Sequence, residues 1–292
     1  MILVAGATGA LGSEICRKLR ERGSATRALV RASSAADKVA RLKALGVETV
    51  VGDLKDRASL AAACQGVEAV ISTVSMIMTG QSGDSFEATD GAGNIALIDA
   101  ASAARVSRFV FVSFDTGATP DAPLVSAKRS VEAHLVQSGL SYTILHPTLF
   151  MESWLGPMLF ADPAAGAAKR LGDGTRSASY VAVRDVAEVA VRCVAFAPAH
   201  NRVLSFGAEA LSQRDALAIF TEVFETHFDV TEIPEQALEA QWSNAADPMS
   251  KSFSALMLGV ARGSLQANRL DPAEFPIRWT SVREFVQEMR RA

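Results

Sequence analysis

The sequence has 292 residues, of which 49% are hydrophobic, enough for one large domain or for a large domain with an appended smaller lobe. The formal net charge of -3 and the isoelectric point near 5.9 exclude the basic field that nucleic-acid binding requires. No apolar run reaches the roughly 20 residues that a membrane helix needs, and Met1 leads straight into a predicted strand, so we expect no signal or transit peptide.

The cysteines and histidines show no pattern that binds metal. Cys16, Cys64 and Cys193 lie far apart in the sequence without a Cys-x-x-Cys pair, and the four histidines have no metal-ligand spacing. We expect reduced, buried thiols, no metal site and a cytoplasmic protein. For the oligomeric state, the sequence is compatible with both a monomer and a homodimer.

Short apolar runs rich in β-branched residues alternate with longer helical stretches in the first half of the chain, the pattern of a parallel sheet wrapped by helices. Strands are predicted at Ile2–Ala5, Thr26–Val30, Glu48–Val51, Ala69–Ser72, Arg108–Val112 and Ser141–Leu145. Helices are predicted near Leu11–Arg22, Ala35–Leu45, Ser59–Cys64, Phe86–Ala104 and Leu124–Ser138. Because the strands are continuously apolar, helices should cover both faces of the sheet.

The alternation breaks after about Leu145. A stretch rich in glycine, proline and alanine, 156–174, predicts a long loop or mobile segment. A helix over 184–196, a strand around 203–206 and a helix opened by Ser212 follow. The fold class expected is therefore α/β: a Rossmann-type doubly wound parallel sheet in residues 1–150 that binds NAD(P), with a smaller C-terminal α/β lobe for substrate in residues 151–292, interleaved with the first part as one compact unit.

The most informative motif is the glycine turn between the first predicted strand and the first predicted helix. In this context Gly6 permits the sharp turn, Gly9 lets the backbone approach a pyrophosphate, and Gly12 lets the helix pack on the sheet. The N–H groups and positive dipole end of the helix would face the phosphates. An ordinary glycine-rich turn without a ligand is the alternative. The residues expected to hold the dinucleotide here are Gly6, Ala7, Thr8, Gly9, Ala10, Leu11 and Gly12.

The second predicted strand ends at Arg31, where a protein that binds NAD usually carries an acid for the ribose 2′-OH. A guanidinium can instead bind a 2′-phosphate, supported by the hydroxyl of Ser33 and by Lys38. We therefore expect NADP(H) as the cofactor, with NAD less favoured; the alternative is that Arg31 is a solvated surface residue. Asp53, after the third strand, is placed for the adenine edge or, alternatively, for capping the next helix.

The motifs together resemble the NmrA-like group of the atypical short-chain dehydrogenase/reductases, from residue 1 to about residue 220. The resemblance is carried by the glycine turn and by five further segments: Leu29–Arg31, Gly52–Leu54, Ser126–Lys128, Ser138–Pro147 and Val183–Glu188. The group includes isoflavone-reductase-like enzymes, quinone and triphenylmethane reductases, and redox-sensing regulators that bind NADP(H) without turnover. The resemblance thus implies the fold more firmly than the activity.

The resemblance also implies roles for residues at the ends of the later strands. Ser113 would lie beside the nicotinamide, and Lys128 would contact the nicotinamide ribose. The remaining cofactor contacts that it implies are Gly52, Asp53, Leu54, Thr73, Val74, Ser75, Pro147 and Thr148.

The proton donor of the larger superfamily, the tyrosine of a Tyr-x-x-x-Lys pair, is missing. Leu124 stands at the tyrosine position four residues before Lys128, and neither Tyr142 nor Tyr180 is in register. Lys128 can orient the ribose, act as a general base, or be a solvated helix lysine. His146 stands where relatives usually have arginine; it could be a proton donor near the site, but we interpret it as structural. The catalytic candidates are Lys128 and Ser113.

Large, soft apolar side chains surround the expected pocket. Such linings suit flat or variable hydrophobic substrates, although the same residues could be core or a subunit contact. The pocket candidates are Met76, Met78, Phe150, Met151 and Trp154. We therefore expect an NADPH-dependent reductase of a hydrophobic, electron-poor small molecule such as a quinone. The alternatives are an NADP(H)-sensing regulator without turnover and, more weakly, a structural subunit with a vestigial fold.

Overall fold

The chain divides into two compact units. A computed structural model describes residues 1–77, 80 and 83–291. Unit 1 comprises Met1–Ser113, Ser126–His146 and Val186–Leu204, and unit 2 comprises Phe114–Val125, Pro147–Asp185 and Ser205–Ala292. The chain therefore enters each unit more than once. A cofactor role for one part and a substrate role for the other stay predictions.

Unit 1 is built on a seven-stranded sheet, with the strand order β11-β6-β5-β4-β1-β2-β3. The pairs β1·β2, β2·β3, β1·β4, β4·β5 and β5·β6 are all parallel. This is the predicted Rossmann-type sheet, and the first five strands have the predicted bounds. The strands are β1 (Ile2–Ala5), β2 (Thr26–Val30), β3 (Glu48–Val51), β4 (Ala69–Ser72), β5 (Arg108–Val112), β6 (Ser141–Pro147) and β11 (Arg202–Phe206).

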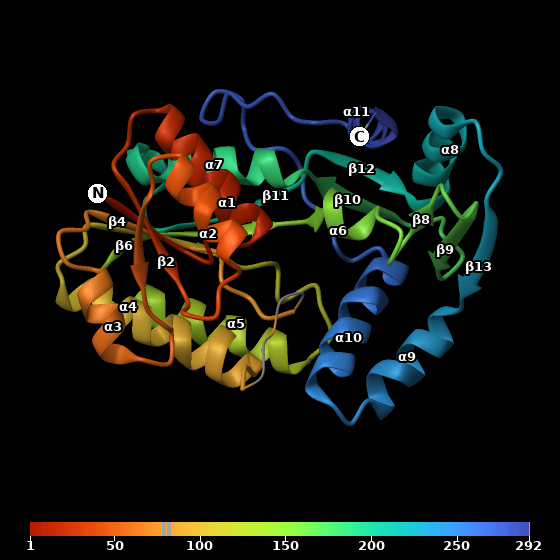
Figure 1. Cartoon of the computed structure of the whole chain (residues 1–292). Helices are drawn as coiled ribbons and strands as arrows, with labels where there is room; N and C mark the ends of the chain where they lie inside the picture. Colours follow the sequence, from red (N-terminus) through yellow and green to blue (C-terminus); the bar gives the residue numbers. More distant parts are fainter. Residues whose placement is uncertain (78–79, 81–82, 292) are drawn as a thin grey trace. The chain divides into compact units, whose positions relative to one another are not determined.

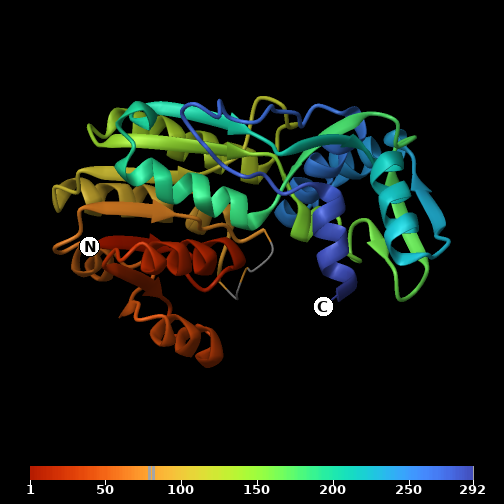
Figure 2. The same cartoon turned by 90° about the horizontal axis from the view of Figure 1, so that it is seen from above.

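Helices cover both faces of this sheet, as the continuously apolar strands predict. Figures 1 and 2 show α1 and α7 on one face, and α3, α4 and α5 on the other. On β1, Leu3 and Ala5 join a core cluster with helical residues such as Leu97 and Val131, whereas Ile2 and Val4 alternate with them and are also buried. The helices are α1 (Ala10–Glu21), α2 (Ala36–Ala44), α3 (Arg57–Ala63), α4 (Asn94–Ala103), α5 (Pro123–Gln137) and α7 (Val183–Ala195), with a short 3₁₀ turn η2 (Ala197–Ala199).

The helix predicted over 86–104 is not α-helical throughout. Its first part, η1 (Phe86–Gly93), is a π-helix that continues into α4. Asn94 donates its side-chain amide to the carbonyls of Thr89 (3.3 Å) and Asp90 (3.0 Å), oxygens that a regular α-helix would bond to backbone N–H groups. The buried Asn94 side chain thus adds two hydrogen bonds to carbonyls at the end of this wider helix.

Unit 2 contains two small sheets and several helices. One sheet has the order β12-β10-β7 and the other β13-β9-β8. The strands are β7 (Leu149–Phe150), β8 (Ala161–Asp162), β9 (Ala167–Leu171), β10 (Ser177–Val181), β12 (Glu209–Ser212) and β13 (Asp229–Ile233). The helices are α6 (Met151–Trp154), α8 (Gln213–Phe224), α9 (Glu235–Asn244), α10 (Pro248–Arg262) and α11 (Val282–Arg291). The smaller α/β lobe of the predicted fold class is therefore present.

The prediction of a loop over 156–174 is wrong, because β8 and β9 lie within it. The turn between these strands is fixed by Asp162, whose carboxylate accepts from the backbone N–H groups of Ala164 and Ala165, and by Gly166, at a φ of +59°. β9 then pairs in parallel with β13, more than fifty residues later in the chain. A strand rich in alanine and held by so distant a partner leaves little local signal.

Two smaller predictions are confirmed. Ser212 begins α8 with a capping box, in which its hydroxyl accepts from the N–H of Asp215 and the Asp215 carboxylate accepts from the N–H of Ser212. Cys16, Cys64 and Cys193 are free and buried. Within the described part of the chain, no helix combines the length and apolarity needed to cross a membrane.

Candidate functional site

The strand order of unit 1 changes direction at β1, which lies between β2 and β4. In open α/β sheets, ligands bind beyond the carboxyl ends of the strands at such a switch point. The glycine turn between β1 and α1 lies there, as do the residues that follow β2 and β4. The topology therefore places the predicted cofactor residues of unit 1 along one edge of the sheet.

The three glycines of the turn differ in how much space surrounds them. A Cβ on Gly12 would lie 2.2 Å from the carbonyl oxygen of Gly6, and one on Gly6, whose φ is +80°, would lie 2.5 Å from Oγ1 of Thr73. A Cβ on Gly9 would meet only the Gly6 oxygen, at 3.3 Å. Gly6 and Gly12 are thus required by the close packing of the turn itself, whereas Gly9 leaves its outer side open.

The N-terminus of α1 is free to receive an anion. Gly9 is the N-cap residue and supplies no side-chain cap for the first-turn N–H groups. An uncapped helix start beside an open glycine is the geometry that accepts a phosphate. The residues present therefore fit the pyrophosphate of a dinucleotide.

Arg31, at the end of β2, is held in place by an acid. Its guanidinium forms an ion pair of 2.7 Å with Asp84, and its side chain is only 31% exposed. This contact excludes the alternative that Arg31 is a freely solvated surface residue. The hydroxyl that supports the Arg31 backbone N–H belongs to Ser34, at 3.0 Å, while Ser33 is exposed.

Asp53 does not cap the next helix. Asp56 is the N-cap of α3 and accepts from the N–H of Ala58, whereas Asp53 accepts from the N–H of Lys55. The capping alternative for Asp53 is therefore wrong, and the adenine contact stays a prediction. Gly52 and Leu54 have packing roles: a Cβ on Gly52 would lie 2.9 Å from Leu29 and Ser59, and Leu54 is buried.

The segment after β4 forms hydrogen bonds first with the end of β1 and then with Lys128 of α5. Thr73 donates both its N–H and its hydroxyl to the carbonyl of Ala5, at 3.0 and 3.1 Å. The carbonyl of Val74 accepts from Nζ of Lys128 at 3.0 Å. Thr73, Val74 and Ser75 thus lie at the edge where the resemblance places the nicotinamide. Met76 is half-buried there, and Met78 lies outside the described residues.

Lys128 is almost completely buried, with 3% of its surface exposed. Its ammonium lies 3.6 Å from the Asp90 carboxylate and 4.9 Å from the centre of the Phe111 ring. Burial lowers the pKa of Lys128, and the nearby Asp90 and Glu132 carboxylates oppose that shift only in part. The interpretation of Lys128 as a solvated helix lysine is excluded.

Asp90 and Asn94 belong to the same buried network, and no motif in the sequence predicted them. Both are 0% exposed. Asp90 accepts from the backbone N–H of Met76 at 3.0 Å, and Asn94 accepts from the hydroxyl of Ser72 at 2.6 Å. The available signal was two polar residues four positions apart on an otherwise apolar helical face. Such side chains are rarely buried without a structural or chemical purpose.

Ser113, at the end of β5, takes part in a second polar cluster. Its hydroxyl donates to Glu132 in a short hydrogen bond, and Glu132 also contacts Nε2 of His146 at 3.0 Å. Glu132 lies one helical turn after Lys128 on α5. The contact of His146 with Glu132 agrees with the structural interpretation of His146.

Neither tyrosine can substitute for the missing proton donor. Leu124, at the usual tyrosine position of α5, is 3% exposed. Tyr180 is 2% exposed in β10, and burial raises the pKa of its phenol far above the neutral range. Tyr142 pairs with Phe109 near the start of β6, away from the carboxyl ends of the strands. In the described structure, no tyrosine is in register with Lys128.

Unit 2 contains the remaining predicted site residues, Pro147, Thr148, Phe150, Met151 and Trp154. Thr148 donates its N–H to the carbonyl of Phe206, while its buried Oγ1 has no hydrogen-bond partner among the described residues. The predicted contact of Pro147 and Thr148 with a carboxamide would use that hydroxyl. Of the pocket candidates here, Met151 is fully buried, whereas Phe150 and Trp154 keep exposed surface and can contact a ligand without rearrangement.

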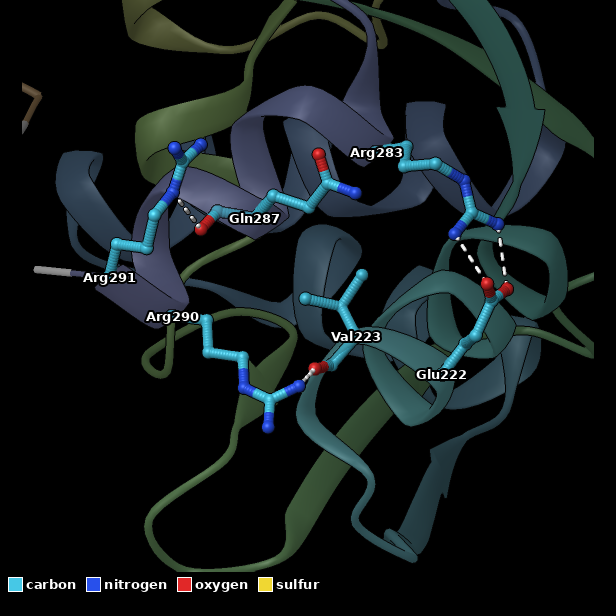
Figure 3. Close-up of a pocket in the computed structure, with 6 residues that line it drawn as sticks. All are labelled: Glu222, Val223, Arg283, Gln287, Arg290 and Arg291. Carbon is cyan, nitrogen blue, oxygen red and sulfur yellow. Dashed lines mark hydrogen bonds and ion pairs between the residues drawn. The ribbon is translucent and has the colours of Figure 1, made fainter.

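A hollow between α8 and α11 of unit 2 contains none of the predicted site residues (Figure 3). Arg283 lies across it from Glu222, and the two form a bidentate ion pair of 2.7 and 2.8 Å. Arg290 donates to the carbonyl of Val223. Because these cations are exposed and already engaged, the hollow is not the candidate site. Among the residues that the structure describes, no group of histidine, cysteine and acidic side chains is arranged to hold a metal ion.

Comparison with known proteins gives consistent matches along the chain. The family model for the NmrA-like family matches residues 1–286. An NAD(P)H azoreductase of Xenophilus azovorans is 33% identical, with 75% of this chain and 72% of that protein covered. The photosystem II assembly factor Ycf39 of Cyanophora paradoxa is 31% identical, with 82% of this chain and 73% of that protein covered. The NADPH-dependent quinone oxidoreductase QOR2 of Escherichia coli, solved with NADPH, is 23% identical with a TM-score of 0.78, covering 99% of this chain and 100% of that chain.

Proposed function

We propose, from the premise that this chain belongs to the NmrA-like family, that it is an NADPH-dependent reductase of a hydrophobic, electron-poor small molecule. The cofactor would supply a hydride. The chain would bind the cofactor, orient its nicotinamide and exclude water. The azoreductase relative and the quinone oxidoreductase of similar fold support a conjugated acceptor of this kind.

The observation that carries the proposal is the uncapped start of α1 beside the open Gly9, with Arg31 at the end of the neighbouring strand β2. The first feature fits a pyrophosphate, and the second fits a 2′-phosphate. The type of acceptor is inferred from the absence of a tyrosine four residues before Lys128. Without a tyrosine in register, the chain has no phenol to protonate an alkoxide, so an acceptor that itself stabilises the negative charge after hydride transfer is favoured.

The test of the proposal is NADPH oxidation by the purified chain with a panel of quinones, azo dyes and other conjugated acceptors. We expect the nicotinamide absorbance to fall faster with NADPH than with NADH, and only when an acceptor is present. Binding of NADPH without turnover across the whole panel would contradict the reductase.

A second candidate function is a cofactor-sensing protein that binds NADP(H) without turnover. The engagement of the Lys128 ammonium by Val74 and Asp90 favours it, because a lysine so committed has little surface left for a reacting group. One relative is named as an assembly factor rather than as a reductase. This function predicts NADPH binding that is tight, changes protease sensitivity, and gives no turnover.

Arg31→Ala is expected to weaken NADPH binding by about 10- to 100-fold, since a charge-assisted contact with phosphate is lost, and to change NADH binding by less than about twofold. Titration of the reduced-nicotinamide fluorescence measures both affinities. Arg41→Ala, which removes an exposed arginine of α2 paired with Asp37, is the matched control. Equal losses for the two cofactors would show that Arg31 does not contact the 2′-phosphate.

A further inference from the structure

Asp84 joins two cations that approach it from different strands of the sheet. Its Oδ2 is paired with Arg31, after β2, at 2.7 Å, and its Oδ1 is paired with Lys55, after β3, at 3.0 Å. Lys55 also donates to the carbonyl of Gly83, and Thr89 donates its hydroxyl to Asp84 Oδ1 at 3.3 Å. The Asp84 side chain is 2% exposed, while Arg31 and Lys55 are 31% and 39% exposed. The acid is therefore enclosed, and the two cations reach the surface.

The charges of this cluster do not cancel. Arg31 and Lys55 contribute two positive charges and Asp84 one negative charge, so the cluster keeps a formal surplus of one positive charge. Because both cations bind oxygens of one carboxylate, their nitrogens lie on the two sides of a single small anion. A phosphate has the same need for two such donors, and it carries more charge than a carboxylate.

We infer that Arg31 and Lys55 together bind the 2′-phosphate of NADP(H), and that Asp84 is a built-in counter-ion that weakens this binding and limits the preference for NADP(H) over NAD(H). The inference rests on the proposed cofactor. It adds Lys55 and Asp84, which neither the glycine motif nor the strand-end arginine indicates.

Asp84 and the 2′-phosphate would compete for the same donors. Without a ligand, Asp84 is paired with both Arg31 and Lys55. When a 2′-phosphate enters, the enclosed carboxylate remains nearby and repels it, and the cations must be shared between the two anions. An NAD(H) ribose carries no such charge, so Asp84 would affect its binding little.

The experiment measures the dissociation constants of NADPH and NADH by fluorescence or calorimetry for three variants of the whole chain. Asp84→Asn keeps the shape and an accepting oxygen but removes the charge, and we expect it to tighten NADPH binding by about tenfold and to leave NADH within about twofold. Lys55→Ala should weaken NADPH binding by about tenfold or more, with NADH unchanged. The double variant should return NADPH binding toward that of the wild type.

Asp37→Asn is the matched control, because it removes one exposed carboxylate that is paired with Arg41 in the same region of the chain. It should change neither affinity, and thermal melts of every variant establish that it is folded. Weaker NADPH binding in folded Asp84→Asn would overturn the inference, because Asp84 would then position Arg31 rather than compete for it. Equal changes for NADPH and NADH would overturn it as well. If the wild type binds neither cofactor, the proposed function itself fails, a result separate from both.

Discussion

Gly9→Ala is expected to reduce NADPH and NADH binding by at least about 100-fold while the protein stays folded, a loss equivalent to about 2.7 kcal/mol. The added methyl group would meet only the Gly6 carbonyl oxygen within the chain, at 3.3 Å, so a small shift accommodates it. The same methyl group would occupy the side from which a pyrophosphate approaches the backbone and the N–H groups of α1. Cofactor titration and thermal unfolding measure the two effects separately.

Two further glycine variants control this experiment. Gly12→Ala should lower the melting temperature in addition to weakening cofactor binding. Its methyl group would lie 2.2 Å from a backbone oxygen, and overpacking of this kind costs about 1–3 kcal/mol. Gly23→Ala, at a φ of +73° with open space around it, should cost about 1 kcal/mol of stability and leave both affinities intact. Unimpaired cofactor binding by folded Gly9→Ala would show that the turn holds no pyrophosphate.

The sheet of unit 1 was predictable because its signals are local. Each strand contains a short run of apolar or β-branched residues and stops before a polar or glycine residue, so β1 to β5 end where the sequence predicts. The glycine turn is equally local, since the close contact between Gly6 and Gly12 spans only six residues. The order of strands β1 to β6 is the one that Rossmann-type folds share.

The strands of unit 2 and the partners within the site were not predictable in this way. β9 depends on β13, which lies far along the chain, and its alanine-rich sequence carries no strand signal of its own. Asp84 appears in the sequence as one acid in a polar loop, and only the fold brings it to Arg31 and Lys55. Asp90 likewise belongs to the site only through its ion pair with Lys128, which lies on a different helix. A sequence motif predicts the residues that would contact a ligand. It does not predict the second set of residues that neutralise the charges of the first set or fix their orientation.

Lys128→Met is expected to reduce turnover by about 100-fold or more, if Lys128 orients the nicotinamide ribose or moves a proton at the reacting end. Methionine keeps the length and apolar stem of the side chain but removes the ammonium that contacts Val74 and Asp90. The same change should also destabilise the fold, by about 3–5 kcal/mol, because the buried Asp90 carboxylate loses its counter-ion. Steady-state kinetics and denaturant unfolding measure these losses.

The double variant Asp90→Asn with Lys128→Met separates the chemical role from the structural one. The neutral amide can still accept from the N–H of Met76, and no uncompensated charge remains, so most of the lost stability should return while turnover stays low. Recovery of turnover together with stability would instead assign Lys128 a purely structural role.

The pH dependence of stability provides an independent test of the buried ammonium. Burial lowers the pKa of Lys128 below its ordinary value of 10.5, so the folded chain releases this proton at a lower pH than the unfolded chain does. Within the window between the two pKa values the unfolded state binds more protons, and the free energy of unfolding contributed by this group rises with pH. The wild type should show that rise below pH 10.5, and the double variant should lack it. Identical profiles would mean that Lys128 titrates normally in the folded protein, which would exclude it as a neutral base at physiological pH and leave ribose orientation as its role.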